Sequence, residues 1–543
     1  MVAVAPASAI TAVELTVGGD VLGPDVLTAL GGVRIAERLS CPAQCELRIV
    51  GVHHATRFPI GDALGVRFAT DDEAAFDGEI TALRHVFSAD GLPEVRVRAY
   101  DRLHRLRKRQ TVRAFTDTDL VAVAGELVAD LGLAVDAEAA VPPWAQLVQH
   151  RQSDLELLDE VAQRAGLWFV LRGDRVRLVT LAGVDDPITL TYGVELVEAA
   201  IEQNSDAACR SVTALGWDAD GAAPVRGEQT EPSVAFTPAD ATAPARWDVP
   251  GSRVLAQAVG AGVDSLNALA RAELDVRAAR ELTVVGTATG DARLRAGGRV
   301  AIEGLGRAVA GRAGGPESTN RPSDDQVEAL RGPHLLAEVV HTLDELGHLT
   351  WFSSRPPDLR PIDGATTVTI ATVTDVDDPD GHGRVKATFG GFDDLGSVWL
   401  PVVAPAAGAG KGLVALPDVD DVVVVLLPHG NPGEGLVLGG LFGHRGPFDP
   451  GVASGEVQRF SFATPGGQSV VLDDEHGRLR LRDRTGNLVE LGTDTMKLHA
   501  AVDLVIEAPG RNLTVRAKRV DFEEAAGTED APAGSGATEG GGS

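Results

Sequence analysis

Arg478-Leu479-Arg480-Leu481-Arg482 opens the repeat that decides the fold class of this chain. An apolar residue recurs at every second position, which is the period of a strand with one buried face and not that of a helix. The same alternation returns after turn-forming segments such as Thr485-Gly486-Asn487 and Pro509-Gly510. The units recur at a period of roughly 8 residues, which is typical of a stacked β array.

This repeat extends from residue 468 to residue 524 and has little core of its own. Because an isolated hairpin is only marginally stable in water, we expect the ribbon to need partners, most simply copies of itself. The alternate apolar side chains would then be buried between the copies, and the charged residues between them would discourage stray strand pairing. The predicted core residues are Leu479, Leu481, Met496, Leu498, Leu504, Ile506, Leu513, Val515, Val520 and Phe522.

Residues 365–443, which precede the repeat, form a compact unit that contains only strand-like runs. These runs include Gly383-Arg384-Val385-Lys386, Ser397-Val398-Trp399-Leu400 and Gly435-Leu436-Val437-Leu438-Gly439. Several short strands within this length suggest an OB-type barrel.

Residues 1–360 combine strand-like runs with helices. The first part, to about residue 100, alternates apolar runs with turn residues and is interpreted as a small β barrel, and another barrel-like group follows later in the region. Between them we predict a helix at about 117–130, with Thr116 or Thr118 as its N-cap. A second helix opens with the capping-box pattern Ser153-Asp154-Leu155-Glu156, and a third is expected at 264–282.

The composition limits the classes of function. The 543-residue chain has 49 Lys and Arg against 78 Asp and Glu, a formal net charge of −29, which disfavours nucleic-acid binding. The three cysteines argue against a disulfide framework and suit a reducing compartment. The N-terminus lacks a secretory signal pattern, and no run approaches the ~20 apolar residues of a membrane span. We therefore expect synthesis and assembly in the cytoplasm, without stable membrane insertion.

The order of the segments carries a resemblance to a known family. The runs of residues 383–439 resemble the OB domain of VgrG and phage baseplate assembly protein V spikes, through Gly383, Arg384, Val385, Trp399, Gly435 and Gly439. The run Tyr100-Asp101-Arg102-Leu103-His104-Arg105-Leu106 is similar to the hub of VgrG-like spikes of extracellular contractile injection systems, which are related to type VI secretion. The resemblance covers nearly the whole chain in the same domain order.

This resemblance implies a mainly β, multidomain protein with a few helices. Its parts would be a hub of β barrels with helical insertions at 1–360, an OB-fold domain at 361–447, a trimeric β-helical needle at 448–525 and a disordered, acidic, Gly-rich tail at 526–543. It also implies a homotrimer beneath a contractile tail tube, in contact with tube and baseplate proteins. A PAAR-like tip protein and effector cargo are further candidate partners. The sequence leaves open whether such a particle is released from the cell.

The run from Arg102 to Arg113 is the most basic segment of this acidic chain. A nucleic-acid patch is one interpretation, but a basic face on an acidic protein is favoured. We hypothesise that Arg102, Arg105 and Arg109 form an assembly interface that neutralises acidic neighbours in the hub or the tube.

No catalytic residue, cofactor or metal site is predicted. Gly410-Lys411 lacks the earlier glycine and the following Ser or Thr of a phosphate loop, and the acidic run at 375–381 lacks two oxygen ligands of a calcium loop. Cys41, Cys45 and His53-His54 offer zinc-type ligands without the spacing of a standard finger, so buried or incidental thiols are favoured.

Two rival functions remain open at this point. A trimeric fibre-like adhesin that binds a surface glycan would more often end in a receptor-binding head than in a small-residue tail. An envelope-degrading enzyme would resemble those phage spikes that carry a lysozyme domain between barrel and needle, but residues 445–460 are too few for a domain. The sequence therefore favours a structural spike without catalysis that punctures the target envelope.

Overall fold

The computed structural model describes residues 13–68, 73–89, 91–139, 141–206, 208–218, 223–234, 251–259, 262–305, 330–359, 366–443 and 446–523. The predicted tail at 526–543 lies outside these described residues. The chain divides into two compact units, Met1–Leu441 and Phe442–Ser543. The first unit holds the predicted hub and most of the predicted OB domain, and the boundary between those two parts stays a prediction.

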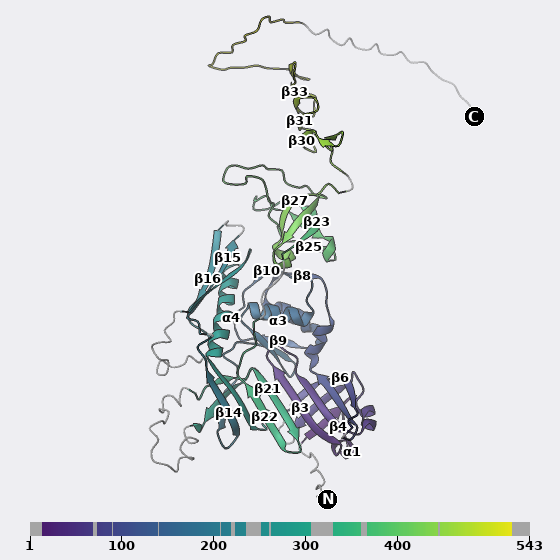
Figure 1. Cartoon of the computed structure of the whole chain (residues 1–543), viewed down its shortest axis with the longest axis vertical. Helices are drawn as coiled ribbons and strands as arrows, with labels where there is room; N and C mark the ends of the chain where they lie inside the picture. Colours follow the sequence, from purple (N-terminus) through teal and green to yellow (C-terminus); the bar gives the residue numbers. More distant parts are fainter. Residues whose placement is uncertain are drawn as a thin grey trace, which may run out of the picture. The chain divides into compact units, whose positions relative to one another are not determined.

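An 11-stranded antiparallel sheet dominates the hub (Figure 1). Strand β21 pairs with β3, and Val339 lies opposite Glu37. These two strands come from opposite ends of the hub sequence. The two predicted barrel-like groups are therefore parts of one continuous sheet. Its strands, in spatial order, are β14 (Leu196–Gln203), β18 (Leu282–Thr289), β22 (Gly347–Ser353), β21 (Glu338–Asp344), β3 (Leu30–Arg38), β4 (Gln44–Val50), β7 (Glu94–Tyr100), β6 (Phe76–Val86), β5 (Ala63–Phe68), β1 (Val13–Val17) and β2 (Asp20–Val21).

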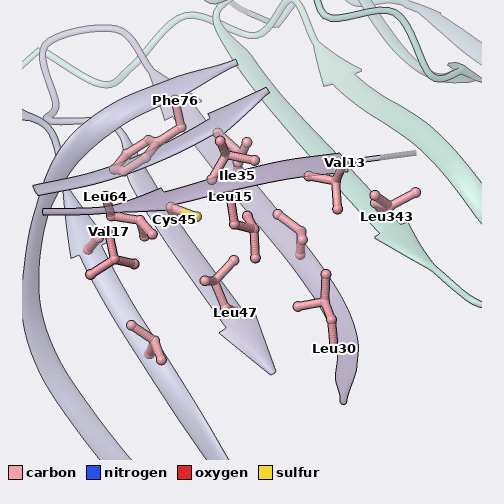
Figure 2. Close-up of a cluster of buried hydrophobic side chains, with 14 of the residues drawn as sticks. Val13, Leu15, Val17, Leu30, Ile35, Cys45, Leu47, Leu64, Phe76 and Leu343 are labelled. Carbon is pink, nitrogen blue, oxygen red and sulfur yellow. The ribbon is translucent and has the colours of Figure 1, made fainter. Parts of the chain in front are cut away.

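The core of the N-terminal half of this sheet follows from the alternation of its strands. In β1, Val13, Leu15 and Val17 are buried and the residues between them are half-buried, as expected for a strand with one face in the core. Figure 2 shows these side chains gathered with others from β3, β4 and β5, and Leu343 of β21 joins the same cluster. Two short helical segments, α1 (Pro24–Leu27) and η1 (Val52–Arg57), accompany these strands.

A helical module follows β7 in sequence. The capping box predicted at Ser153 is present, because the Ser153 hydroxyl accepts the backbone N–H of Glu156 and the Glu156 carboxylate accepts the backbone N–H of Ser153. This box begins the helix α3, whose apolar face packs with Leu120 and Phe169 in one buried cluster. The elements of the module are η2 (Arg102–Lys108), β8 (Arg113–Thr118), α2 (Leu120–Val128), η3 (Ala129–Leu131), β9 (Ala134–Ala137), β10 (Trp144–Gln149), α3 (Asp154–Arg164), β11 (Trp168–Arg172) and β12 (Arg175–Val179).

The predicted start of the first helix was wrong. Neither Thr116 nor Thr118 is its N-cap, since both lie in β8, which pairs with β10. Asp119 is the N-cap, and its carboxylate accepts the backbone N–H of Ala122. Residues 113–118 therefore form a strand and not the start of a helix, because they pair with β10, which lies further along the sequence.

The rest of the hub contains α4 (Val263–Glu281), which confirms the helix predicted at 264–282. Leu266 and Leu274 of α4 share a buried cluster with Val212 and Ala214 of an adjoining small sheet. None of the helices in the described ranges combines the length and apolar composition that a membrane span requires. The remaining strands are β15 (Ser211–Asp218), β16 (Ala223–Gln229) and β17 (Ser252–Val259) in one small sheet, and β13 (Ile188–Thr191), β19 (Arg299–Glu303) and β20 (His334–Leu335) in another.

Residues 367–440 form a five-stranded antiparallel sheet in the place of the predicted OB domain. Its order is β25 (Leu395–Gly396), β24 (Lys386–Phe389), β23 (Thr367–Asp375), β26 (Val422–Leu427) and β27 (Leu436–Gly440), with short turns η5 (Gly390–Phe392), η6 (Pro428–Gly430) and η7 (Pro432–Glu434). Val373, Phe389 and Val425 are fully buried in its core. The chain is thus mainly β with a few helices, as the sequence predicted.

The second unit is an antiparallel β ribbon. A small hairpin of β28 (Val452–Ala453) and β29 (Glu456–Val457) precedes five strands that pair in sequence order: β30 (Arg459–Ala463), β31 (Ser469–Asp473), β32 (Arg478–Arg482), β33 (Leu488–Leu491) and β34 (Met496–His499). The opening pentapeptide of the repeat is β32 itself, so its alternation correctly indicated a strand.

The strands expected at 504–507, 513–516 and 520–523 are not formed in the single chain. Residues 500–523 carry no strand pairing, and Leu504, Ile506, Leu513, Val515, Val520 and Phe522 are exposed there. A strand is held by hydrogen bonds to a neighbour, and these residues lie beyond the last paired strand of their own chain. A place for these residues in a needle core therefore stays a prediction.

Candidate functional site

The OB residues named from the sequence shape the five-stranded sheet. Gly383 has a φ of +73°, which a residue with a side chain rarely adopts. Next to it, the Arg384 guanidinium contacts Asp378, with Nη2 2.8 Å from Oδ1. Val385 is fully buried and exchanges two backbone hydrogen bonds of 2.7 and 2.9 Å with Leu400. In this tripeptide, Gly383 adopts the backbone conformation of a turn, Arg384 holds the turn through Asp378, and Val385 is the first buried residue after it.

The Arg384–Asp378 pair also explains the acidic run at 375–381. Both carboxylate oxygens of Asp378 are engaged, because Oδ2 accepts the backbone N–H groups of His382 and Arg384. The Arg384 guanidinium, supported by these N–H groups, holds the pKa of Asp378 well below its usual range. The run is therefore an acidic turn held by an arginine.

Trp399, Gly435 and Gly439 complete the set. The Lys386 ammonium lies 4.7 Å from the centre of the Trp399 ring, in a cation–π arrangement. A Cβ atom on Gly435 would lie 2.9 Å from Cγ1 of Val425, so only glycine fits without a shift of the core. Gly439 has a φ of +153° and pairs at the register shift between Val424 and Val425.

The basic run at 102–113 begins with η2 and continues through Arg109. The structure places its three named arginines against groups of the same chain. The N-cap Asp101 accepts the backbone N–H of Leu103. The Arg102 guanidinium donates to the backbone oxygen of Gly173 at 3.1 Å. The Arg105 guanidinium donates from two nitrogens to the Glu79 carboxylate, one of them Nε at 3.1 Å.

Arg109 enters a buried polar node beyond the end of η2. Its Nε lies 2.8 Å from Oδ2 of Asp154, and its Nη1 lies 2.7 Å from Oδ2 of Asp130. Asp154 is also contacted by Arg113 at 3.0 Å and by the side-chain amide of Gln149 at 2.8 Å. The predicted basic face is therefore largely used inside the hub, and its role in assembly stays a prediction.

The residues predicted for the needle core fall into two groups. Leu479 and Leu481 lie on β32 and Met496 and Leu498 on β34, whereas the other six follow β34. Leu481, Leu498 and Leu504 line one open groove of about 490 Å³ in the second unit, together with Phe462. The structure thus brings these apolar side chains to one surface, and Leu498 is still 56 % exposed there.

Charged pairs brace the ribbon beside this groove. Nε of Arg480 on β32 lies 2.5 Å from Oε2 of Glu490 on β33. The turn after β32 is closed by Asp483, which accepts from the Thr485 hydroxyl and from Asn487. These bonds hold the pKa of Asp483 low, at about 2.

Among the described residues, one group of three side chains has ligand atoms close enough to share a metal ion: Asp473, Glu475 and His476. Both carboxylates already face arginines, because Arg478 Nε lies 3.1 Å from Asp473 and Arg459 Nη1 lies 3.1 Å from Glu475. The negative charges of Asp473 and Glu475, which a metal ion would neutralise, are thus already balanced by Arg478 and Arg459.

The cysteine and histidine set weighed from the sequence does not form such a group. Cys45 is fully buried in the sheet core, and burial raises the pKa of its thiol well above the usual range. The rings of His53 and His54 lie 4.0 Å apart, centre to centre, on η1. Neither Cys41 nor Cys45 forms a disulfide.

Comparison with known proteins places the OB residues in a family. Residues 369–442 match the Type VI secretion system/phage-baseplate injector OB domain. A second match, to the Alg8 N-terminal domain, covers residues 62–313. That range begins just before β5 and omits β1 to β4, β21 and β22 of the same sheet, so it does not correspond to a folded unit of this chain.

One curated relative and two solved structures extend the likeness. The type VI secretion system spike protein VgrG4b of Pseudomonas aeruginosa is 34 % identical over 115 residues, which are 20 % of this chain and 13 % of the relative. The chain thus spans a small part of that relative. The VgrG complex with PdpA from Francisella, in its lidded form, matches 91 % of this chain and 80 % of the solved chain at 7 % identity and a TM-score of 0.50.

The lidless form of a PdpA–VgrG complex matches 90 % of this chain and 98 % of the solved chain, also at 7 % identity and a TM-score of 0.50. At such identity the likeness concerns the fold. The chain thus carries the injector OB domain in its sequence and is similar to VgrG in fold over nearly its whole length. The resemblance predicted from the hub and OB residues is confirmed.

Proposed function

We propose that this chain is the structural central spike of a phage-tail-like contractile injection system. Three copies would assemble beneath the tail tube, and contraction would drive their ribbons through the target envelope to deliver cargo. The observation that carries the proposal is the injector OB domain at 369–442, followed in sequence by a β ribbon whose apolar face is open. Hub, OB domain and ribbon follow one another in the order of such spikes.

The apolar ribbon supports self-association. Soluble chains rarely leave a contiguous apolar surface to water, and such surfaces mark interaction sites. Met496, Leu498 and Leu504 are each more than half exposed. If three ribbons wind together into a β-helical needle, these side chains become the core and the unpaired residues 500–523 gain neighbours.

The polar side of the ribbon supports a mechanical role. Strands that pair across chains distribute load over many backbone hydrogen bonds, while cross-strand ion pairs fix their register. Arg480 and Glu490 form such a pair between β32 and β33. A needle built in this way resists sliding and keeps a hydrated outer surface.

The partners follow from the same proposal. The hub would contact tail-tube and baseplate proteins, and the end of the ribbon would carry a PAAR-like tip protein. One VgrG relative of known structure is in complex with PdpA, and by likeness we propose that this chain also carries effector cargo. Assembly would take place in the cytoplasm, before the particle fires or leaves the cell.

We propose no catalytic activity for the chain. The carboxylates of Asp473 and Glu475 face arginines, and the Cys45 thiol is enclosed in the core, which supports a structural role for these groups. Release of soluble products from peptidoglycan or envelope glycan by the purified protein would overturn this part of the proposal.

Native mass spectrometry of the full chain tests the trimer directly. We expect a species of three times 56.5 kDa, and a folded monomer at all accessible concentrations would contradict the needle. Imaging of particles from the producing cell then separates the spike from its rival. An axial density beneath the tube supports the spike, whereas a peripheral fibre supports a glycan-binding adhesin.

A further inference from the structure

A hollow of about 350 Å³ lies beside η2. We call it the η2 hollow, and its walls come from β6, β7, η2 and the loop at Ile60 and Gly61. The register between β6 and β7 shifts between Ile80 and Ala82, as at a β-bulge, and Ile80 and Thr81 line the hollow at this shift. Bulges of this kind redirect side chains and are common beside binding sites.

The acidic group in the η2 hollow is already neutralised. Glu79 accepts two hydrogen bonds from the Arg105 guanidinium. His104 stands next to it, with Nδ1 2.7 Å from the backbone oxygen of Asp101. Burial lowers the pKa of His104, so its ring is uncharged at neutral pH. The charge of the hollow is therefore set by its other basic residues.

Those residues are Arg98, Arg107 and Lys108, which line the same hollow. In the part of the chain that the structure describes, their charged groups form no ion pair or side-chain hydrogen bond. Glu46, which lies opposite Arg98 on β4, is 3.9 Å from Arg96 instead. The Arg107 guanidinium is held over the Tyr100 ring at 5.1 Å from its centre. Three unpaired cations thus converge on one concave site.

This arrangement contrasts with the rest of the basic segment. Arg105 and Arg109 have carboxylate partners within the hub, and Arg102 has backbone oxygens. A protein of net charge −29 has many carboxylates available, yet among the described residues none forms an ion pair with these three cations, and Asp101 interacts with Arg107 only at longer range. Arginine is suited to bind a carboxylate through two parallel hydrogen bonds. The η2 hollow is therefore complementary to an acidic group from outside the chain.

The surroundings decide which kind of anion fits. The overall charge of the protein repels free small anions at long range, whereas a segment delivered by an otherwise bound partner needs only local attraction. Ile60, which is 64 % exposed, adds an apolar contact at the rim that a phosphate ion cannot use. Both features favour a peptide with acidic and apolar side chains.

We propose that the η2 hollow is a docking site for an acidic peptide segment of a protein partner, whose carboxylates pair with Arg98, Arg107 and Lys108. This goes beyond the spike function, because it assigns a specific surface and a partner chemistry to the hub. In this proposal the residues that contact the partner are Arg98, Arg107 and Lys108, rather than the Arg102, Arg105 and Arg109 named from the sequence.

The test uses the purified full chain and a fluorescein-labelled peptide, Gly-Glu-Leu-Glu-Glu-Gly, with its Gln analogue as control. Fluorescence anisotropy at low salt should show binding of the acidic peptide and not of the analogue. Arg98→Gln and Arg107→Gln should each weaken binding about tenfold, the size of one charge-assisted hydrogen bond. Arg84→Gln, on β6 but outside the hollow, should leave the affinity unchanged.

Further measurements separate loss of binding from loss of folding and distinguish a peptide site from a phosphate site. Thermal unfolding should show that the Gln variants are folded, since the replaced charges form no ion pair or side-chain hydrogen bond in the described hub. Ile60→Asp should also weaken peptide binding, and inorganic phosphate at equal ionic strength should not compete. Absence of peptide binding, equal loss with Arg84→Gln, or displacement by phosphate would each overturn the proposal.

Discussion

Arg109 Nε lies 2.8 Å from Oδ2 of Asp154, whose side chain is only 3 % exposed. This ion pair joins the end of the basic segment to the first turn of α3. Arg113 and Gln149 satisfy the other oxygen of Asp154, so the node closes the helical module of the hub. A residue that looked like part of an external basic face is thus a support for the fold.

Arg109→Met should therefore destabilise the hub. The substitution keeps the volume of the side chain but leaves Oδ2 of Asp154 without its cation in a buried place, which costs about 1–3 kcal/mol. We expect the loss in the free energy of unfolding, measured with urea. The matched change Arg105→Met should cost less than about 1 kcal/mol, because Arg105 is half exposed and its pair is screened by water. Equal losses for the two variants would contradict the role of the node.

Titration of His341 should lower the stability of the hub as the pH falls from about 6.5 towards 4, whereas the buried carboxyl of Asp101, whose pKa burial raises to about 7, acts in the opposite direction. His341 is buried between Thr350 and the backbone oxygen of Leu294, at 3.0 and 3.1 Å, and burial lowers its pKa to about 4. The unfolded chain would bind a proton near pH 6.5 that the folded chain resists, so acid favours unfolding. The difference between 6.5 and about 4 corresponds to roughly 3 kcal/mol when the pH is below both values.

A pH series of urea unfolding measures this effect. His341→Gln removes this titrating group, so a fall from pH 7 to pH 4.5 should be less destabilising for the variant than for the unsubstituted chain. His85→Gln is a control, because His85 is an exposed side chain on β6. An identical pH dependence in the His341 variant would show that another group causes the acid sensitivity. Glu37 contributes only at lower pH, because Arg295 and Arg172 outweigh its burial and hold its pKa below 4.5.

Gly435→Ala should destabilise the OB domain. Its new Cβ atom would lie 2.9 Å from Cγ1 of Val425 and 3.3 Å from Cδ2 of Leu400, both in the core. Overpacking of this kind costs about 1–3 kcal/mol. Gly396→Ala is the matched control, because a Cβ atom there meets nothing within 4 Å. Differential scanning calorimetry should show a lower unfolding temperature for the first variant only, and equal temperatures would mean that the core can move to admit the methyl group.

The sequence could predict what depends on local patterns. The alternation in residues 478–482 indicated β32, the pair Ser153 and Glu156 indicated the start of α3, and the strand-like run that begins at Gly383 indicated the OB domain. These features follow from side-chain period, capping chemistry and backbone conformation, which are fixed by neighbours in sequence.

What the sequence could not predict depends on distant partners. Pairing of β21 with β3 merges the two expected barrels, and pairing of β8 with β10 replaces the expected start of α2. The same holds for charges. Arg105 and Arg107 are two positions apart, yet Arg105 meets Glu79 and Arg107 lies over Tyr100. Which cation remains unpaired is therefore decided by the packing of η2 on β6 and β7.

Leu498→Asp should prevent association through the ribbon. Leu498 pairs with Val489 across β33 and β34 and lines the groove that also contains Leu481 and Leu504. In a needle, three copies of the new carboxylate would be enclosed near one another, where both desolvation and like-charge repulsion oppose assembly. Native mass spectrometry should show loss of the trimer. Circular dichroism should be nearly unchanged, because Leu498 is exposed on the ribbon of the second unit and belongs to no buried core.

The matched control is Leu346→Asp, which makes the same chemical change at a residue that is 86 % exposed in the turn between β21 and β22. It should leave the trimer intact. Loss of the trimer in both variants would point to a general effect of added charge, and persistence of the trimer with Leu498→Asp would place the self-association outside the ribbon. Leu481→Asp separates these cases further, because it tests β32 at the other side of the same groove. If the groove is the interface, the two ribbon variants fail alike, since each buries a carboxylate in the same enclosed core.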